Sequence, residues 1–315
     1  MQNRRLGNSE LFIGPLVFGG NVFGWTIDEP TSFVLLDAFT DAGFNCIDTA
    51  DVYARWAPGD RAGISETIIG KWLKQRGKRE KLVIATKVGK EMGKDKKGLS
   101  AKYIREAVHD SLKRLQTDYI DLYQSHDDDL STPLEETLAA YTELIREGKV
   151  RVIGASNYSA GRLAEALSVS RSHGFARYES LQPHYNLYDR ESYEKELDAL
   201  CLAENIGVIS YFSLASGFLT GKYRSERDFS KSQRGGGIQK YLNPRGFRIL
   251  DALDAVSASY HTAPATIALA WLLSRKSITA PIASATNTDQ LKTLLQATRI
   301  QLNQEDLSLL TEAGK

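Results

Sequence analysis

Four residues whose side chains could share one reaction stand far apart in the sequence, each at or just beyond the end of a short apolar run. They are a carboxylate, a phenol, an ammonium group and an imidazole: Asp48, Tyr53, Lys87 and His126. The apolar runs are typical of β-strands, and the carboxyl ends of the strands of an α/β barrel all face one mouth. We therefore expect the four side chains to meet in one site. A phenol beside a buried ammonium group could donate a proton near neutral pH.

Strand-like and helix-like stretches alternate along the chain and would position these residues. The predicted strands cover residues 16–18, 44–47, 82–86, 119–123, 150–154, 179–182, 206–210 and 279–282. The predicted helices cover residues 31–42, 65–75, 101–115, 134–147, 159–172, 191–204, 264–274, 287–297 and 304–313. Ser65 is expected to cap the second helix, and residues 4–13 to form a hairpin. Strand–helix units in this number predict a (β/α)8 TIM barrel.

The alternative architecture is an open, doubly wound sheet. It is disfavoured because no G-x-G-x-x-G motif follows the first strand. No linker or second boundary interrupts the chain, so residues 1–315 are expected to form a single domain. A stretch from about residue 222 to 246 reads as irregular, and its place after the seventh strand predicts a long lid over the mouth. A second polar loop, at residues 91–98, follows Lys87.

Composition narrows the range of partners. Lys and Arg number 40 against 39 Asp and Glu, so we expect neither nucleic acid nor a membrane surface as the main partner. Cys46 and Cys201 lie in apolar segments and are expected to be buried, reduced thiols. The chain starts in polar turn residues and has no apolar run near ~20 residues, which predicts a cytoplasmic protein without a signal peptide. The oligomeric state stays open.

Six short motifs occur in an order that extends over essentially the whole chain. They are DTADVY at 48–53, ATK at 85–87, QSHDDD at 124–129, GASN at 154–157, LQPHYN at 181–186 and LASGFLTGKY at 214–223. With these motifs the chain resembles the aldo-keto reductase family, in particular its bacterial branch related to potassium-channel β-subunits. The resemblance implies reversible, NADPH-dependent reduction of an aldehyde or ketone to an alcohol, with NADH a less favoured cofactor.

The resemblance also implies a role for each of the four residues. Hydride transfer to a carbonyl leaves an alkoxide, which needs a proton and electrostatic stabilisation. Tyr53 would donate the proton, and Lys87 would stabilise phenolate character on it. Asp48 would keep Lys87 charged and oriented, and His126 would hydrogen-bond the carbonyl oxygen.

The cofactor residues that the resemblance implies fall into three groups. Ser156, Asn157 and Gln182 would surround the nicotinamide carboxamide, whose donors and acceptors match these side chains, and Tyr211 would stack on its ring. A second group, Leu214, Ser216, Gly217 and Lys222, would wrap the pyrophosphate. The third would hold the adenosine-phosphate end, with Ser284, Thr286 and Gln290, and with Arg234 reaching the 2′-phosphate from the lid. Lys231 is an alternative to Arg234 for the 2′-phosphate. Thr293 and Leu294 depart from the Glu-Asn pair usual in the family, which puts the adenine contacts in doubt.

Aromatic residues at the barrel mouth are candidates for the wall of the substrate pocket, because they suit a mostly apolar carbonyl compound. They are Trp25, Trp56, Tyr185 and Tyr188, although any of them could simply pack a loop. Two other functions stay open. One is a nicotinamide-binding regulatory subunit with slow turnover. The other is a metal-dependent hydrolase built on His126 and the aspartates at 127–129, although their spacing matches no familiar ligand pattern and no metal is predicted.

Overall fold

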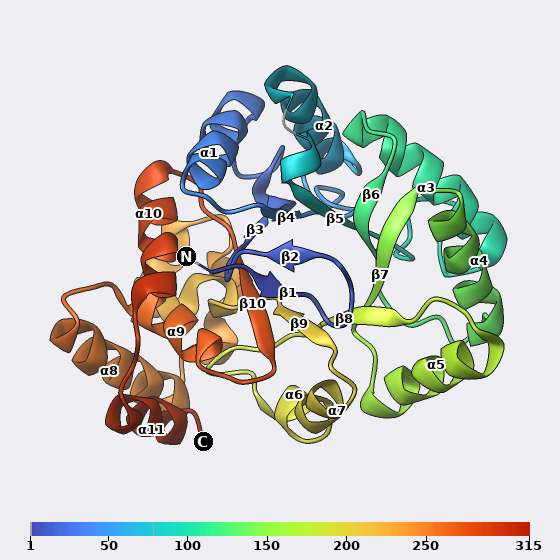
Figure 1. Cartoon of the computed structure of the whole chain (residues 1–315). Coiled ribbons are helices and arrows are strands. Elements are labelled where there is room, and N and C mark those ends of the chain that lie inside the picture. Colours follow the sequence, from blue (N-terminus) through green and yellow to red (C-terminus); the bar gives the residue numbers. More distant parts are fainter. Residues whose placement is uncertain (1, 78) are drawn as a thin grey trace.

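A ring of parallel strands forms the centre of the protein (Figure 1). The computed structural model describes residues 2–77 and 79–315, and in them the strands close in the order β10-β3-β4-β5-β6-β7-β8-β9. The strands are β3 (Val17–Gly19), β4 (Cys46–Asp48), β5 (Val83–Val88), β6 (Ile120–Ser125), β7 (Val150–Ser156), β8 (Tyr178–Gln182), β9 (Gly207–Ser210) and β10 (Ile278–Ala283). The (β/α)8 barrel predicted from the sequence is confirmed.

Helices surround the ring and cover its outer face (Figure 1). They are α1 (Glu29–Asp41), α2 (Ile64–Arg76), α3 (Ala101–Leu115), α4 (Leu134–Arg146), α5 (Ala160–His173), α6 (Glu191–Glu194), α7 (Leu197–Ala203), α8 (Pro244–Ser259), α9 (Pro264–Leu273), α10 (Thr288–Gln296) and α11 (Gln304–Ala313). Strands β5 and β6 are buried on both faces, as expected of a parallel sheet that helices cover. None of the helices in the described ranges combines the length and apolar character needed to cross a bilayer.

The predicted N-terminal hairpin closes one end of the barrel. Its strands β1 (Arg4–Arg5) and β2 (Phe12–Ile13) pair antiparallel, and the hairpin crosses the ring in Figure 1. The buried side chains of Leu6, Leu11 and Ile13 pack with interior residues of the strands. This apolar plug stabilises that end of the barrel and leaves the opposite end for a ligand.

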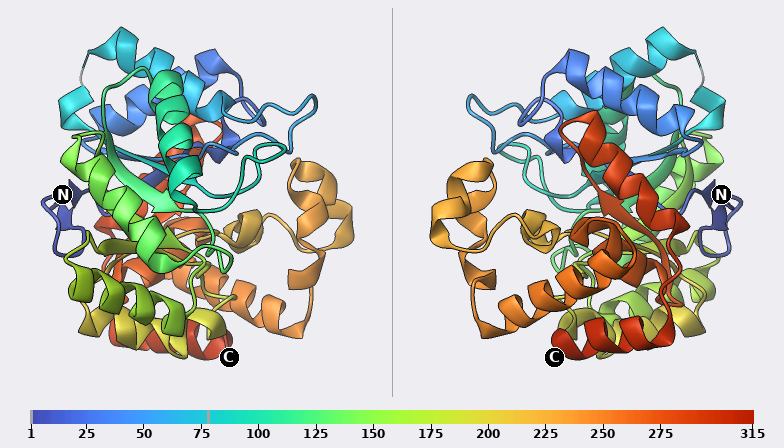
Figure 2. Two further views of the ribbon diagram at one scale, coloured as in Figure 1. Left: turned by 90° about the vertical axis from the view of Figure 1, so that its right-hand side faces the viewer. Right: turned by 90° about the vertical axis from the view of Figure 1, so that its left-hand side faces the viewer.

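Long loops gather at the opposite end, as the sequence predicts. Figure 2 shows the loop that follows Tyr53 (blue) and the segment near residues 225–243 (orange) on the side away from the hairpin. We call residues 222–243 the lid segment. It contains the short 3₁₀ turns Glu226–Lys231, Gly235–Gly237 and Gln239–Tyr241, so it is more ordered than the irregular stretch we predicted.

Three local predictions were wrong. Helix α8 was not predicted, although Asn243 caps it through Gly246 N and Pro244 begins it. The predicted helix 191–204 is two helices, α6 and α7, separated at residues 195–196. Ser65 does not cap α2, because Gly63 at φ 82° occupies that position. The Ser65 hydroxyl instead donates to the carbonyl oxygen of Gly20 at 2.8 Å.

Candidate active site

Asp48, Tyr53 and Lys87 form one hydrogen-bonded cluster at the open end of the barrel. The buried Lys87 Nζ donates to Asp48 Oδ2 at 2.7 Å and to the carbonyl oxygen of Thr49 at 2.8 Å. It also lies 2.9 Å from the Tyr53 hydroxyl, so all three ammonium donors have partners. The Tyr53 hydroxyl is 3.4 Å from Asp48 Oδ2. The cluster fixes the phenolic oxygen beside a cation.

Two amide side chains hold the other oxygen of Asp48. Gln182 Nε2 donates to Asp48 Oδ1 at 2.9 Å, and Gln124 Nε2 donates to the same atom at 3.3 Å. Gln124 is not among the residues predicted from the sequence, and Gln182 was predicted to contact the nicotinamide. The signal for Gln124 was its place two residues before His126, because alternate residues of a strand face the same side.

Burial sets the protonation of the cluster. It raises the pKa of Tyr53 well above 10, and the charge of Asp48 adds to the rise. Burial also lowers the pKa of Lys87, with Asp48 acting in the opposite direction. Our prediction for the Tyr53 pKa included the effect of Lys87 but not the effects of burial and of Asp48 on that pKa. A phenol that keeps its proton at neutral pH is suited to act as an acid.

His126 completes the predicted group of four. It follows β6, is 7% exposed, and its ring lies edge-on to the Tyr53 ring with 6.0 Å between centroids. Burial, followed by the charge of Lys87, lowers the pKa of His126 well below 6.5. Its Nδ1 has no hydrogen-bond partner in the described part of the chain. A neutral imidazole can therefore orient a polar atom placed beside Tyr53.

An aromatic wall extends outward from Tyr53. Its ring contacts Trp56 edge-on at 5.7 Å between centroids, and Trp56 contacts Trp25 in the same way at 5.7 Å. Trp56 is 48% exposed. We call Tyr53, Trp56 and Trp25 the aromatic wall. Two of the predicted substrate residues, Trp25 and Trp56, are thus brought together with the acid.

The other two predicted substrate residues lie elsewhere. Tyr185 is fully buried, its hydroxyl donates to Glu194, and its ring packs against Trp271 of α9. It therefore belongs to the layer between the barrel and its helices and not to a substrate wall. Tyr188 packs edge-on against Tyr241 of the lid segment, so its ring supports that segment.

Three of the residues predicted to hold nicotinamide form a network beside His126. Asn157 Nδ2 donates to the carbonyl oxygen of His126 at 2.9 Å, and the Tyr211 hydroxyl donates to Asn157 Oδ1 at 2.7 Å. Ser156 Oγ donates to the carbonyl oxygen of Gln182 at 2.9 Å. The Tyr211 ring stacks on His184, which holds it at the mouth.

The loop that follows β9 contains several residues with positive φ, a conformation that is found in anion-binding loops. Phe212, Ala215, Ser216 and Gly217 all have positive φ, with Gly217 at 96°. Successive residues in such conformations can turn their amide groups toward one anion. A Cβ on Gly217 would lie 3.5 Å from Lys222 Nζ, so the loop and the lysine converge. No carboxylate of the described residues lies within 4.0 Å of that nitrogen.

The predicted adenosine end lies where β10 leads into α10. The hydroxyl of Ser284 donates to the carbonyl oxygen of Gly19 at 2.8 Å, and Gln290 Oε1 accepts from the backbone amide of Thr286 at 2.9 Å. Thr286 and Gln290 thus meet at the N-terminus of α10, where anions are favoured, and Ser284 precedes Thr286 by two residues. Leu294 is buried in the core, so it offers nothing to an adenine ring.

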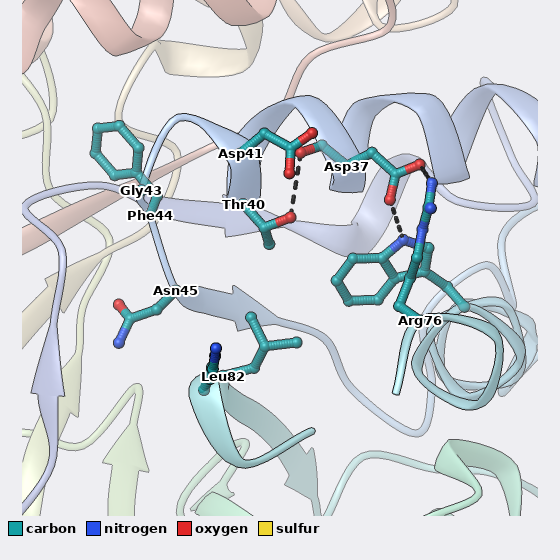
Figure 3. A pocket seen from close by; sticks show the side chains of 10 residues that line it. Asp37, Thr40, Asp41, Gly43, Phe44, Asn45, Arg76 and Leu82 are labelled. Atoms are coloured by element: carbon teal, nitrogen blue, oxygen red, sulfur yellow. Dashed lines mark hydrogen bonds and ion pairs between the residues drawn. The ribbon is translucent and has the colours of Figure 1, made fainter. Parts of the chain in front are cut away.

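The protein has a depression beside the site and a separate cavity at the other end of the barrel. A depression of about 780 Å³ opens beside the cluster, between Val52, Lys90 and Asp127. A cavity of about 270 Å³ lies at the opposite end, because its residues Phe44, Asn45 and Leu82 precede β4 and β5 (Figure 3). This second cavity contains none of the predicted site residues.

The aspartates after His126 are engaged in local contacts. Asp128 pairs with Arg162 at 3.0 Å, and Asp127 lies 3.4 Å from Lys90 Nζ. Burial acts to raise the pKa of Asp129, but hydrogen bonds that include those from Ser131 and Thr132 outweigh it and lower the pKa to about 2. Within residues 2–77 and 79–315, no group of three or more acidic, histidine or cysteine side chains could hold a metal ion.

A further buried carboxyl, Asp51, lies behind the cluster. Neither of its side-chain oxygens has a hydrogen-bond partner in the described residues. Nearby, Glu66 accepts from Arg114 Nε at 2.6 Å and from Thr86 Oγ1 at 2.6 Å. Burial, followed by the charge of Glu66, raises the pKa of Asp51 from 3.8 to about 8, and Arg114 opposes the rise. Asp51 is therefore a neutral carboxylic acid at pH 7.

Because the pKa of Asp51 is raised in the folded protein, we expect the free energy of unfolding to depend on pH. The folded protein keeps a proton on Asp51 that the unfolded chain releases, so the free energy of unfolding falls as pH rises from about 4 to about 8. In Asp51→Asn that contribution disappears. We expect the wild type to lose on the order of a few kcal/mol more than the variant over this range in urea unfolding. Asp251→Asn, at an exposed position of α8, is the control. Parallel pH curves for wild type and Asp51→Asn would show that Asp51 is ionised in the fold.

Comparison with known proteins gives a consistent picture. The model of the family described as "Aldo/keto reductase family" matches residues 15–315. A Bacillus subtilis (strain 168) protein described as an uncharacterized oxidoreductase, YrpG, is 35% identical, over 99% of this chain and 95% of that protein. The aldo-keto reductase YhdN of the same organism is 34% identical, over 95% and 87%. A probable voltage-gated potassium channel subunit beta of Oryza sativa subsp. japonica is 33% identical, over 92% and 89%.

Proposed function

This chain belongs to the aldo/keto reductase family and is an oxidoreductase, and from that premise we propose that it reduces an aldehyde or ketone to an alcohol with NADPH. The observation that carries the proposal is the contact of Lys87 Nζ with both the Tyr53 hydroxyl, at 2.9 Å, and Asp48, at 2.7 Å. A buried phenol held beside a cation, with a neutral imidazole next to it, matches the needs of an alkoxide that forms from a carbonyl.

Each residue of the cluster has one task in this proposal. Tyr53 donates its hydroxyl proton to the carbonyl oxygen as negative charge develops there. Lys87 stabilises the phenolate that Tyr53 becomes, and Asp48 keeps Lys87 charged despite its burial. His126 hydrogen-bonds the carbonyl oxygen and orients it. Asp48 and Lys87 are buried, so the interaction between them is stronger than it would be in water.

The residues around the cluster fit a nicotinamide dinucleotide. The positive-φ loop at 212–217 and Lys222 suit its diphosphate, and Ser284 with Thr286 at the start of α10 suits a further phosphate. Ser156, Asn157 and Tyr211 suit the nicotinamide end. Bound NADPH supplies a hydride for the carbonyl carbon. NADH lacks the 2′-phosphate, so a protein contact to that phosphate would favour NADPH over NADH.

The test is steady-state oxidation of NADPH with a panel of aldehydes and ketones, read from the absorbance of the reduced nicotinamide. We expect saturable, substrate-dependent turnover, and a higher KM for NADH than for NADPH. Tight NADPH binding without turnover of any carbonyl compound, or of any alcohol with NADP⁺, would favour the other candidate, a regulatory subunit whose nicotinamide state controls a partner. That second candidate is motivated by the likeness to the rice channel subunit.

Lys222 provides a test of the diphosphate site. In Lys222→Ala, we expect the Kd for NADPH to rise about tenfold at low salt and less at high salt, because a charge-assisted phosphate contact is lost. Lys240→Ala is a matched control, since both lysines lie in the lid segment over a tyrosine ring, at 5.0 Å and 4.7 Å from its centroid. Equal Kd values for Lys222→Ala and wild type at every salt concentration would remove Lys222 from the site.

A further inference from the structure

The carboxylate of Asp189 joins the lid segment to the loop that follows β8. The Tyr241 hydroxyl, near the end of the lid segment, donates to Asp189 Oδ2 at 2.9 Å. His184 Nε2 lies 3.1 Å from the same oxygen, and Asn186 Nδ2 donates to it at 3.0 Å. One carboxylate oxygen thus holds both a side chain of the lid segment and a ring beside the barrel mouth.

Asp189 is ionised at neutral pH, which fixes the role of His184. Burial acts to raise the pKa of Asp189, but hydrogen bonds that include those from His184 and Asn186 outweigh it and hold the pKa well below 3.8. A carboxylate only accepts hydrogen bonds, so His184 donates from Nε2. Lys240 Nζ lies 4.0 Å from Asp189 Oδ1, but the lysine side chain is 58% exposed, so this pair contributes little.

From His184 the contacts continue to His126. The His184 ring stacks on the Tyr211 ring, with 5.3 Å between centroids and 24° between planes, and the backbones of these two residues pair as a parallel bridge. The Tyr211 hydroxyl donates to Asn157 Oδ1 at 2.7 Å, and Asn157 Nδ2 donates to the carbonyl oxygen of His126 at 2.9 Å. Each step between the lid segment and His126 is therefore a direct hydrogen bond or ring contact.

We propose that His184 is a positioning residue for the reaction, which aligns His126 only while the lid segment is seated on Asp189. The inference rests on the proposed reductase function, in which His126 orients the carbonyl oxygen. Stacking alone restrains the His184 ring loosely, because the torsion that turns a histidine ring has broad minima. The hydrogen bond to Asp189 removes this freedom, so the Tyr211 ring lies against a fixed surface and its hydroxyl stays aimed at Asn157.

The alignment can be measured without turnover. The chain has five histidines, so two-dimensional NMR of histidine-labelled protein can resolve the ring nitrogens of His126. We expect Tyr241→Phe, which removes one hydroxyl and keeps the ring, to shift the His126 resonances, and Tyr223→Phe to leave them in place. Tyr223 is the matched control, because its hydroxyl bonds within the lid segment, to Ser232. His126 resonances that stay in place in both Tyr241→Phe and His184→Ala would overturn the proposal.

Turnover gives the second arm, as a double-mutant cycle. A displacement of about 1 Å at a reacting group can cost about a hundredfold in rate, so we expect His184→Ala to lower kcat for an aldehyde about tenfold. Tyr241→Phe should lower kcat about threefold in the wild type and not at all in His184→Ala, because its effect reaches His126 only through His184.

Two outcomes of the cycle would contradict the proposal: an equal effect of Tyr241→Phe in both backgrounds, or the kcat of the wild type in His184→Ala. A wild type that turns over no carbonyl compound would instead refute the reductase function. In that case His126 resonances that move in Tyr241→Phe and His184→Ala, but not in Tyr223→Phe, would still support the coupling of the lid segment to His126.

Discussion

Tyr53→Phe is expected to reduce kcat by about a thousandfold or more, with the Kd for NADPH changed by less than about twofold. The substitution removes one hydroxyl, and with it the proton donor and the acceptor of the 2.9 Å contact from Lys87. The ring remains, so its edge-on contacts with Trp56 and His126 can persist. The measurement combines steady-state turnover of an aldehyde with fluorescence titration of NADPH.

The control for this substitution is Tyr260→Phe. That residue also donates its hydroxyl to a carboxylate, Asp306 at 2.8 Å, but on the surface of the protein. Its loss should leave kcat unchanged. If Tyr53→Phe retained the turnover of the wild type, the proton donor would have to be another group, with His126 the nearest alternative.

Asp48→Asn is expected to have the second largest effect, on both stability and the pH profile. Asp48 accepts from Lys87, Gln182 and Gln124, so an amide there loses the ion pair and faces other donors. Removing one partner of a buried pair costs about 3–5 kcal/mol of stability. The pKa of Lys87, already lowered by burial, falls further without this carboxylate. Activity that needs the charged Lys87 is therefore lost at a lower pH than in the wild type.

The measurement is kcat/KM against pH together with urea unfolding. Asp121→Asn is a matched control, because Asp121 is also a buried strand carboxylate, paired with Arg79 at 2.7 Å, but at the start of β6. It should lose stability without moving the pH profile. If kcat/KM falls at the same alkaline pH in Asp48→Asn as in the wild type, Asp48 does not control the charge of Lys87.

Local patterns predict much of this structure. Helix α3 was predicted with its observed bounds; in the structure Ser100 caps it through Tyr103 N, and its buried residues form an apolar stripe. The meeting of Asp48, Tyr53, Lys87 and His126 follows from barrel topology, which places the ends of β4, β5 and β6 at one mouth. Both predictions need only short-range patterns and one rule about strand ends.

Local sequence patterns do not predict contacts between segments that lie far apart in the chain. Tyr185 lies three residues past β8, where strand alternation no longer indicates a side chain's direction, and its burial depends on Trp271. Arg234 was assigned to the 2′-phosphate from the family resemblance and its place in the predicted lid, whereas its position over Trp25 depends on how the lid segment folds back. The neutral Asp51 likewise depends on the desolvation that several elements create together.

The most direct test of the account is the fate of the transferred hydrogen. NADPH deuterated at the transferable position of its nicotinamide ring would be incubated with an aldehyde that the protein turns over, and the alcohol analysed by mass spectrometry. Direct hydride transfer at the Tyr53 site predicts one deuterium per molecule on the carbinol carbon, with its formation abolished in Tyr53→Phe. An alcohol without deuterium, or one formed equally well by Tyr53→Phe, would contradict the proposed chemistry.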